Sequence, residues 1–203
     1  MGDNSFSSVS YCYSTGNVSG ENEIGGLVGN NNQGSLSNFY SIGDVNGVDV
    51  VGGLVGGHWK GSISNCYSVG DVNGFWNVGG LVGANGGIVS YCYSTGGVSG
   101  RSSVGGLVGD GFDITNSYWD IETSGKPNMC GMLNCDNSYG KTTAEMMQQS
   151  TFTDWDFINV WNIGENQTYP YLRSYLAADI NKDGIVNLLD LSITANQWME
   201  GVE

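Results

Sequence analysis

The pentapeptide Gly-Gly-Leu-Val-Gly occurs four times in this chain of 203 residues, and its even spacing constrains the fold more than any other feature. The copies begin at residues 25, 52, 79 and 105, so the steps between them are 27, 27 and 26 residues. A second short element, centred on a tyrosine, keeps the same step at residues 12–14, 39–41, 66–68, 92–94 and 117–119. A period of this length is typical of folds that stack one supersecondary unit on the next. Each repeat is therefore expected to be one copy of a single stacked element.

The repeated units are predicted to be strands and turns. Glycine, serine, asparagine, valine and tyrosine dominate up to residue 120, and glycine recurs too often for a helix interior. Apolar and polar residues roughly alternate over residues 61–74, and residues 78–83 add a second apolar run, so we expect two or three short strands per unit. Stacking would form two interior ladders, one of leucine (Leu27, Leu54, Leu81 and Leu107) and one of valine (Val18, Val45, Val72 and Val98).

The units predict an all-β fold, a parallel β-solenoid of about 4–5 coils whose hand the sequence leaves open. A β-propeller is the main alternative, but its blades need about 40 residues or more, and a 27-residue unit is too short. We place the solenoid at residues 1–122, a mixed, aromatic-rich capping segment at residues 123–176, and a short calcium loop–helix module at residues 177–203.

The repeated unit resembles the GLUG repeat, a module of bacterial surface and secreted proteins. Such proteins include large adhesins and some extracellular peptidases, in which the module lies outside the catalytic domain. The resemblance covers about residues 8 to 120 and rests on the recurring Gly-Gly-Leu-Val-Gly and tyrosine-centred elements. It implies a structural or adhesive stalk rather than catalytic chemistry.

The segment after the repeats is rich in aromatic residues. Residues 141–149 predict a helix that begins with a threonine cap and an acidic first turn. Phe152, Trp155, Phe157 and Trp161 follow closely, and the run ends at residues 169–172. Two interpretations stay open: a buried hydrophobic plug that closes the last coil, or an exposed platform on which sugars stack. Burial of the rings would distinguish them.

Residues 179–190 match the calcium loop of an EF-hand. Oxygen side chains stand at the first, third, fifth, ninth and twelfth places, with glycine at the sixth and an apolar residue at the eighth. The predicted calcium ligands, with Ile185 acting through its carbonyl oxygen, are Asp179, Asn181, Asp183, Ile185, Asn187 and Asp190. Apolar residues then recur at steps of three and four up to Trp198, which predicts an amphipathic helix after the loop.

Asparagine at the ninth place and aspartate at the twelfth make this loop similar to a type I dockerin repeat, over about residues 177 to 199. Dockerins carry two such repeats and bind cohesins, which gather polysaccharide-degrading enzymes onto scaffolds or cell surfaces. This chain has one repeat, and Leu188 and Leu189 replace the small hydroxyl residues that often contact cohesin. The resemblance implies calcium binding and a protein partner.

The charge balance excludes some partners. Six Lys and Arg stand against 20 Asp and Glu, a formal net charge of −14, and no basic stretch could neutralise phosphates. We therefore expect no nucleic acid partner, and without a run of about 18 apolar residues we expect no membrane insertion. The start of the chain lacks a secretion signal and falls part-way through a repeat, so we expect a fragment or mature form of an extracellular or cell-surface protein.

The five cysteines form two groups. Cys12, Cys66 and Cys92 share one column of the repeat and are expected to be core thiols, with a Cys66–Cys92 bridge as the alternative. Cys130 and Cys135 share a polar loop and are the better disulfide pair for an exported protein.

No catalytic arrangement is apparent in the sequence, and we expect no enzyme activity. Asp44 and Asp71 share a column, but its other members are Asn17 and Gly97. His58, the single histidine, has no nucleophile motif around it. Three acidic residues near the end of the solenoid lack a basic partner and are expected to be solvated: Asp113, Asp120 and Glu122.

The sequence thus predicts a non-catalytic extracellular structural or adhesive protein, whose calcium-binding tail docks to a protein partner or mediates self-association. Two alternatives remain. One is an accessory module of a polysaccharide-degrading complex, with a glycan as a further partner. The other is a self-assembling subunit of an extracellular fibre, in which an open first coil stacks on the next subunit.

Overall fold

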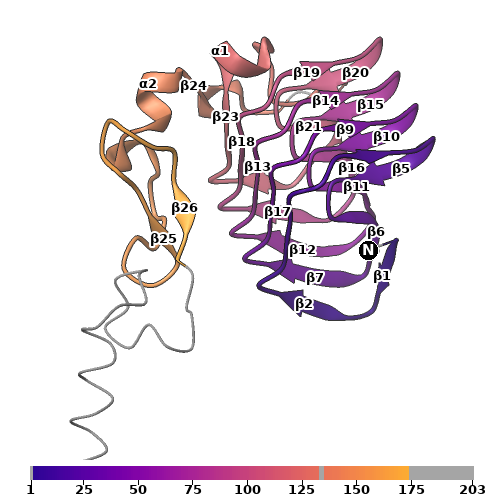
Figure 1. The fold of residues 1–203 in the computed structure, drawn as a ribbon, viewed down its shortest axis with the longest axis horizontal. Helices are drawn as coiled ribbons and strands as arrows, with labels where there is room; N and C mark the ends of the chain where they lie inside the picture. The colour runs from indigo at the N-terminus through magenta and orange to yellow at the C-terminus, as the bar shows by residue number, and fades with distance from the viewer. Residues whose placement is uncertain (1, 133–134, 174–203) are drawn as a thin grey trace, which may run out of the picture.

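The computed structural model describes residues 2–132 and 135–173. The fold is all-β, a parallel β-solenoid of about four turns, as predicted (Figure 1). Each full turn contributes one short strand to each of five parallel sheets, which we number I to V in the order in which the chain visits them.

The strands of each sheet are paired in register with the equivalent strand of the next coil. Sheet I comprises β1 (Asp3–Ser5), β6 (Val28–Asn32), β11 (Val55–His58), β16 (Val82–Asn85) and β21 (Val108–Gly111). Sheet II comprises β2 (Ser8–Ser10), β7 (Gly34–Ser37), β12 (Gly61–Ser64), β17 (Ile88–Ser90) and β22 (Ile114–Thr115). Sheet III comprises β3 (Tyr13–Ser14), β8 (Tyr40–Ser41), β13 (Tyr67–Ser68), β18 (Tyr93–Ser94), β23 (Tyr118–Asp120) and β24 (Gly140–Lys141).

The two remaining parallel sheets complete each turn. Sheet IV comprises β4 (Val18–Ser19), β9 (Val45–Asn46), β14 (Val72–Asn73) and β19 (Val98–Ser99). Sheet V comprises β5 (Asn22–Gly25), β10 (Asp49–Gly52), β15 (Trp76–Gly79) and β20 (Ser102–Gly105). The unit therefore holds five strands rather than the expected two or three, because corners interrupt the apolar runs.

One such corner has a conformation that explains its residues. Five equivalent positions between sheets II and III all have positive φ: Tyr11, Asn38, Asn65, Tyr91 and Asn116. Asparagine tolerates this left-handed region better than most residues, which accounts for its recurrence there.

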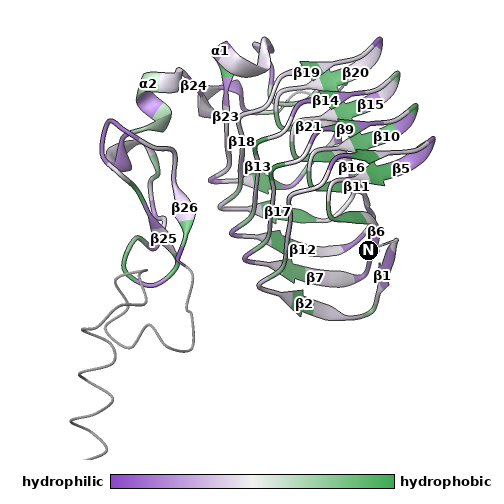
Figure 2. Cartoon of the chain, in the orientation of Figure 1, coloured by the Kyte–Doolittle hydropathy of each residue, from purple (hydrophilic) through white to green (hydrophobic). Residues whose placement is uncertain are grey.

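Both predicted ladders lie in the interior, where hydrophobic residues recur at the same place in successive coils (Figure 2). Leu54, Leu81 and Leu107 are fully buried in the main core. Val45, Val72 and Val98 are buried in a second, smaller core of valine side chains. The equivalent residues of the first coil, Leu27 and Val18, are partly buried.

The glycines of the repeated pentapeptide are required by close approaches inside the coil. A Cβ at Gly52 would lie 2.0 Å from the carbonyl oxygen of Val55, and one at Gly53 would lie 2.1 Å from the Ser68 Oγ. A Cβ at Gly56 would lie 2.5 Å from the backbone of Glu23 in the preceding coil. The pentapeptide thus forms a turn between sheets V and I in which its glycine positions leave no room for a side chain.

The last coil is closed by residues that break the repeat. Trp119 stands in the column occupied by Ser41, Ser68 and Ser94, is fully buried in the main core, and donates its Nε1 proton to the Lys126 carbonyl at 2.8 Å. Helix α1 (Ile121–Ser124) follows and lies above the last coil in Figure 1. The Met129 carbonyl then accepts the Leu107 and Val108 amides, so residues 128–131 continue the stack beyond sheet I.

Residues 142–173, which we call the cover, run along the outer side of the solenoid beside β23, β18 and β13 (Figure 1). The cover follows η1 (Asn137–Tyr139) and contains α2 (Thr143–Met146), η2 (Gln149–Thr151) and an antiparallel pair, β25 (Trp161–Asn162) and β26 (Tyr171–Leu172). The Thr142 cap is confirmed as a capping box with Glu145. The helix is shorter than the predicted 141–149, because the chain turns at Met147 into η2. No helix among the described residues has the length and apolarity needed to cross a membrane.

Candidate functional site

The predicted calcium ligands, Asp179 to Asp190, lie outside the described residues. Within residues 2–132 and 135–173, no group of three or more His, Cys, Asp or Glu side chains is placed to hold a metal ion. The calcium prediction therefore remains a prediction about the C-terminal segment alone.

The most distinctive described surface is a column of tyrosines on the outer side of sheet III, one per coil. Tyr13, Tyr40, Tyr67 and Tyr93 are stacked with ring centroids 5.2, 5.0 and 5.0 Å apart and with interplanar angles of 8° or less. Tyr118 continues the column in the last coil, where β23 pairs in register with β18. We call these five residues the tyrosine column. Parallel offset rings add to the energy of burial, and here the repeat itself imposes their spacing.

The aromatic side chains of the cover pack against this column. Trp155 lies 5.9 Å from Tyr118 and 6.3 Å from Tyr93, between ring centroids. Trp161 lies 6.0 Å from both Tyr93 and Tyr67. Both indoles are buried, with Trp161 fully so. These rings therefore form buried packing and leave no platform for sugars. They cover the flank, however, and not the last coil that we expected them to close, because Trp119 and Met129 already fill that end.

Hydrogen bonds fix the cover at the corners of the coils. The Trp155 Nε1 donates to the Asn116 carbonyl at 2.9 Å, and the Trp161 Nε1 donates to the Asn65 Oδ1 at 3.4 Å. The Tyr93 hydroxyl donates to the carbonyl of Pro170. Each indole thus bridges the tyrosine column and the corner beside it.

A buried carboxylate joins the cover to the last coil. Asp120 is fully buried and accepts from the amides of Glu122 and Thr123 at 2.8 and 3.1 Å. Its second oxygen accepts from the Thr143 hydroxyl at 2.7 Å and the Tyr169 hydroxyl at 2.8 Å. Burial and the bond to Asp120 raise the pKa of Tyr169 to about 12. Asp120 is therefore a structural anchor rather than a solvated acid.

The cover protects the tyrosine column only in part. Tyr118, Tyr93 and Tyr67 are buried, whereas Tyr13 is 63% exposed. Burial raises the pKa of Tyr93 and, with the neighbouring Tyr40, that of Tyr67, so both phenols stay neutral at ordinary pH. Where the cover ends, a groove of about 420 Å³ remains, lined by Tyr11, Cys12, Tyr13, Asn38, Tyr40, Tyr67, Tyr171, Leu172 and Arg173.

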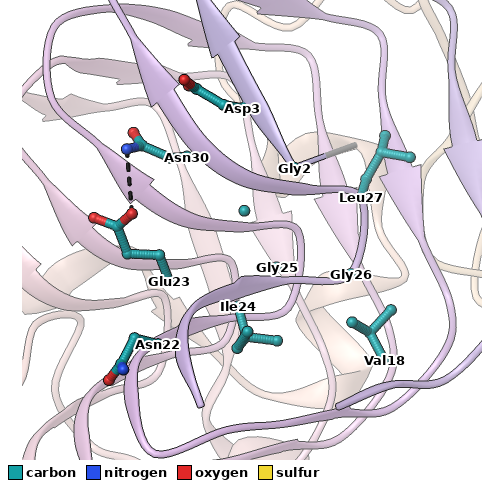
Figure 3. A pocket seen from close by; sticks show the side chains of 11 residues that line it. Gly2, Asp3, Val18, Asn22, Glu23, Ile24, Gly25, Gly26, Leu27 and Asn30 are labelled. Carbon is teal, nitrogen blue, oxygen red and sulfur yellow. Dashed lines mark hydrogen bonds between the residues drawn. The ribbon is translucent and has the colours of Figure 1, made fainter. Parts of the chain in front are cut away.

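A second depression of about 520 Å³ lies at the rim of the first coil (Figure 3). It is lined largely by backbone and glycine, with Val18 and Ile24 on one side. Its carboxylate Glu23 accepts from the Asn30 amide at 3.2 Å. The depression is open and presents few convergent polar groups, which is not the lining of a typical ligand pocket.

The paired aspartates of the repeat are engaged in a ladder along the solenoid. The Asp44 Oδ1 accepts from the Asp71 amide at 3.0 Å, and the Asp71 Oδ1 accepts from the Gly97 amide at 2.8 Å. In the first coil, the Asn17 Oδ1 accepts from the Asp44 amide at 2.9 Å. An amide oxygen and a carboxylate oxygen can both accept this hydrogen bond, which explains why the column contains both asparagine and aspartate.

His58 is fully buried in a column of amides inside sheet I. Its Nδ1 lies 2.9 Å from the Asn31 Nδ2, a donor, so Nδ1 acts as the acceptor. Burial lowers the pKa of His58 and keeps the ring neutral. The ring is enclosed by the coil, with Gly87 directly against it, and it has no access to a substrate.

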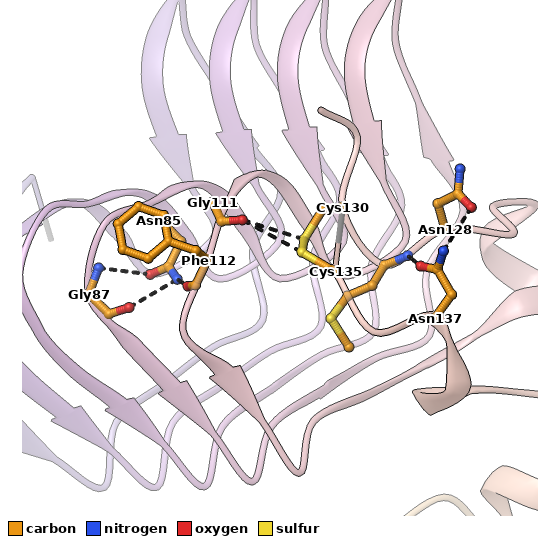
Figure 4. Close-up of a disulfide and its surroundings, with 9 residues drawn as sticks. Asn85, Gly87, Gly111, Phe112, Asn128, Cys130, Cys135 and Asn137 are labelled. Carbon is orange, nitrogen blue, oxygen red and sulfur yellow. Dashed lines mark hydrogen bonds between the residues drawn. A yellow bond between two sulfur atoms is a disulfide. The ribbon is translucent and has the colours of Figure 1, made fainter. Parts of the chain in front are cut away.

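The predicted disulfide between Cys130 and Cys135 is present (Figure 4), with the two Cα atoms 5.8 Å apart. Its sulfurs lie 3.8 and 3.6 Å from the Gly111 carbonyl, beside the end of sheet I. Cys12, Cys66 and Cys92 are free thiols, so the alternative Cys66–Cys92 bridge is absent. Burial raises the pKa of Cys92, which keeps this thiol protonated and inert.

Comparison with known families gives one match. The model of the GLUG motif matches residues 50–73, which run from within β10 to the end of β14, and residues 76–99, which hold β15 to β19, so each match covers about one solenoid turn. The chain therefore contains GLUG repeats, and their structure here is a parallel β-solenoid. No family match supports the dockerin-like resemblance of residues 177–199. Comparisons with curated proteins and with solved structures gave no match.

Sequence reasoning did not identify the surface that receives the aromatic segment. The signal was present, because tyrosine recurs at the repeat step in positions 13, 40, 67, 93 and 118. Alternation within a strand predicts that a buried serine and an outward tyrosine follow one another. An unusual row of outward aromatic residues, followed by an aromatic segment, is the pattern that indicates this packing.

Proposed function

We propose that the chain is a non-catalytic extracellular structural or adhesive module whose calcium-binding C-terminal segment serves docking or assembly. One observation carries the structural part: every sheet of the solenoid continues in register from coil to coil, with a filled interior. Such a stack behaves as a stiff spacer that presents long flanks to its surroundings.

One observation supports an extracellular place. The Cys130–Cys135 disulfide is of a kind that persists in oxidising compartments. The net charge of −14 keeps such a rod soluble and away from anionic surfaces.

The non-catalytic part is supported by the state of the polar groups considered as candidates. Asp44 and Asp71 cap backbone amides, Asp120 is buried in an anchor, and His58 is enclosed in the core. None of these groups faces a cavity together with a second reactive group, as acid–base or nucleophilic catalysis requires.

Calcium titration by calorimetry on residues 1–203 tests the C-terminal part, with light scattering in parallel. We expect one binding event that is lost in Asp179→Ala with Asp183→Ala, since both carboxylates are predicted ligands. A control that removes two solenoid carboxylates, Glu21→Ala with Asp110→Ala, should bind normally. Absence of binding by the unmodified chain would refute the calcium assignment and leave only the spacer.

The other assembly models differ in support. A head-to-tail fibre needs two open ends, and residues 121–132 and 135–141 cover the last coil, which argues against it. Membership of a polysaccharide-degrading complex depends on the same C-terminal segment and is tested by adding a cohesin to the calcium-loaded chain.

A further inference from the structure

The outer face of sheet I has a hollow between two exposed aromatic side chains. Side chains alternate along a strand, so the residues on either side of the buried His58 and Asn85 point outward. At or just after three neighbouring strands, the outward positions hold Gly57 and Trp59 on β11, Ala84 and Gly86 on β16, and Asp110 and Phe112 on β21. The middle pair is small, which leaves a hollow of about 240 Å³ over β16, between Trp59 and Phe112.

The neighbouring glycines let the Trp59 indole lie across the sheet. A Cβ at Gly57 would lie 2.9 Å from the indole Nε1, and a Cβ at Gly86 would lie 3.9 Å from its Cε3. The indole therefore extends from above Gly57 to the edge of the hollow. The Cβ position of Gly86 has no neighbouring atom closer than 3.6 Å, so the space above this glycine is open.

The spacing of the coils suits one ring-shaped group in this hollow. Neighbouring strands lie about 4.8 Å apart, so the backbones at Trp59 and Phe112, which are two strands apart, are separated by about 9.6 Å. In the tyrosine column, the same spacing places the stacked rings of adjacent coils 5.0 Å apart. A ring seated above Gly86 can therefore contact the aromatic side chains on both sides.

The rim of the hollow is polar and carries a negative charge. Asp110 is partly buried, and within the described part of the chain its carboxylate has no hydrogen-bond or ion-pair partner. Asn77 lines the same rim from β15, which packs beside β21, and its Nδ2 donates to the Asp49 Oδ1 at 2.9 Å. A free carboxylate in a chain of net charge −14 favours a ligand that donates hydroxyl protons and disfavours an anion.

We propose that this hollow binds one pyranose unit of a neutral polysaccharide. The apolar face of the sugar ring packs against Trp59 and Phe112, and its hydroxyl groups donate to Asp110. Apolar walls with a few placed polar groups are what a small ligand of mixed polarity requires. The site supplies a ligand for the adhesive role proposed above and rests on that proposal in this respect alone, because every residue in it is described and none belongs to the predicted calcium loop.

Tryptophan oxidation by N-bromosuccinimide, located by peptide mass spectrometry, tests the proposal on the full chain with an internal control. Trp59 and Trp76 are 42% and 45% exposed, so both should react at similar rates in the free protein. The probes are neutral hexasaccharides of glucose, xylose, mannose, galactose and N-acetylglucosamine at millimolar concentration. We expect at least one of them to slow the oxidation of Trp59 several-fold and to leave Trp76 unchanged. If no hexasaccharide protects Trp59 selectively, the proposal is wrong.

Variants then locate the binding site by calorimetric titration with the protecting hexasaccharide. Gly86→Leu fills the hollow from a position with open space and should abolish binding. Phe112→Ala removes one wall and should weaken binding about tenfold. Asp110→Asn should weaken it several-fold, and Trp76→Ala, the matched control, should bind normally. Circular dichroism and urea denaturation establish that each variant is folded. Normal affinity in folded Gly86→Leu, or in Phe112→Ala, overturns the proposal.

Two further measurements separate this proposal from its neighbours. Protection of Trp59 by choline chloride and by none of the sugars would assign the hollow to a quaternary ammonium group, which also binds between aromatic rings, and would overturn the proposal. Calcium titration of the same samples reports on the C-terminal segment alone. A failure of sugar binding is therefore distinguishable from a failure of the calcium assignment.

Discussion

At the scale of single residues, the repeat is explained by what its smallest side chains allow. The second glycine of the pentapeptide faces the buried serine that follows each column tyrosine, and the Ser94 Oγ donates to the Gly106 carbonyl at 2.8 Å. Where the serine is replaced by Trp119, the indole fills the space over Gly106 and the repeat ends. Glycine and serine are therefore paired across the coil, and a tryptophan in the serine column marks the end of the stack.

The tightness of this pairing gives a first prediction. In Gly53→Ala the new Cβ would lie 2.1 Å from the Ser68 Oγ and 2.2 Å from the Gly80 carbonyl oxygen, both in the interior. We expect the free energy of unfolding to fall by about 3 kcal/mol. Urea denaturation followed by circular dichroism measures it.

The matched control is Gly16→Ala, where the added Cβ has no neighbour within 4 Å. It should change stability by no more than about 0.5 kcal/mol. Equal stability of the two variants would show that the coil can relax around a methyl group, against the close packing described above.

The sequence predicted those residues whose environment is set by their own column. The leucine and valine ladders and the Cys130–Cys135 pair are confirmed, because stacking or a short loop brings like residues together. Asp120 was misjudged as solvated, because its partners Thr143 and Tyr169 come from segments 23 and 49 residues away. A column pattern carries no information on such contacts.

At the scale of elements, the cover and the tyrosine column stabilise each other. The column provides parallel rings at a fixed spacing, and the cover provides indoles that bury Tyr67, Tyr93 and Tyr118. The aromatic content of the cover was evident from the sequence, but its place was not, since an end and a flank both accept apolar side chains. The structure resolves this choice because Trp119 and Met129 already occupy the end.

The phenols at this junction make the cover sensitive to alkali. Burial raises the pKa of Tyr67 and Tyr93 in the folded state, and that of Tyr169 is about 12, against about 10 in an unfolded chain. A phenol whose pKa is higher in the folded state than in the unfolded chain contributes its full stabilisation at a pH below the unfolded-state pKa. This stabilisation is lost as the pH rises through the folded-state pKa. We therefore expect the cover to detach between about pH 10 and 12.

Tyrosinate absorbance and tryptophan fluorescence, recorded together, check this expectation. A late group of phenols should ionise as Trp155 and Trp161 become exposed. Tyr93→Phe, which keeps the ring, should remove one late phenol. Ionisation of all 11 tyrosines in one step, with unchanged fluorescence, would contradict the prediction.

At the scale of the whole molecule, the two ends of the stack differ. The first coil has partly buried ladder residues at its rim, whereas the last coil is sealed by Trp119, α1 and Met129. The disulfide lies within this seal. The backbone of Cys130 forms an isolated parallel β-bridge with Val108, and both sulfur atoms lie beside the Gly111 carbonyl. Stability is therefore expected to rise from the first coil to the last.

Removing the disulfide tests this arrangement. The double variant Cys130→Ser with Cys135→Ser removes a disulfide between residues that are 5 apart in the sequence. In the chain-entropy model this lowers the free energy of unfolding by about 2 kcal/mol. Hydrogen exchange should become faster at the amides of Leu107 and Val108, which bond to the Met129 carbonyl, and stay unchanged in the middle coils. The control Cys12→Ser alters a free thiol of the first coil and should leave those two amides protected. Unaltered exchange in the double variant would show that the seal does not need the bond.

The fixed length of the cover has a consequence for how such a protein changes in evolution. Its bonds to Asn116 and Asn65 span the last three tyrosines of the column, from Tyr118 to Tyr67. Duplicating or deleting a repeat within that span would move one anchor by a strand spacing of about 4.8 Å and leave the indoles facing the wrong coils. Repeats before Tyr67 carry no such anchor among the described residues, so units can be gained or lost there. The solenoid thus combines two parts. The number of repeats is constant in the part that the cover spans, whereas the adjoining part is free to vary in length between relatives.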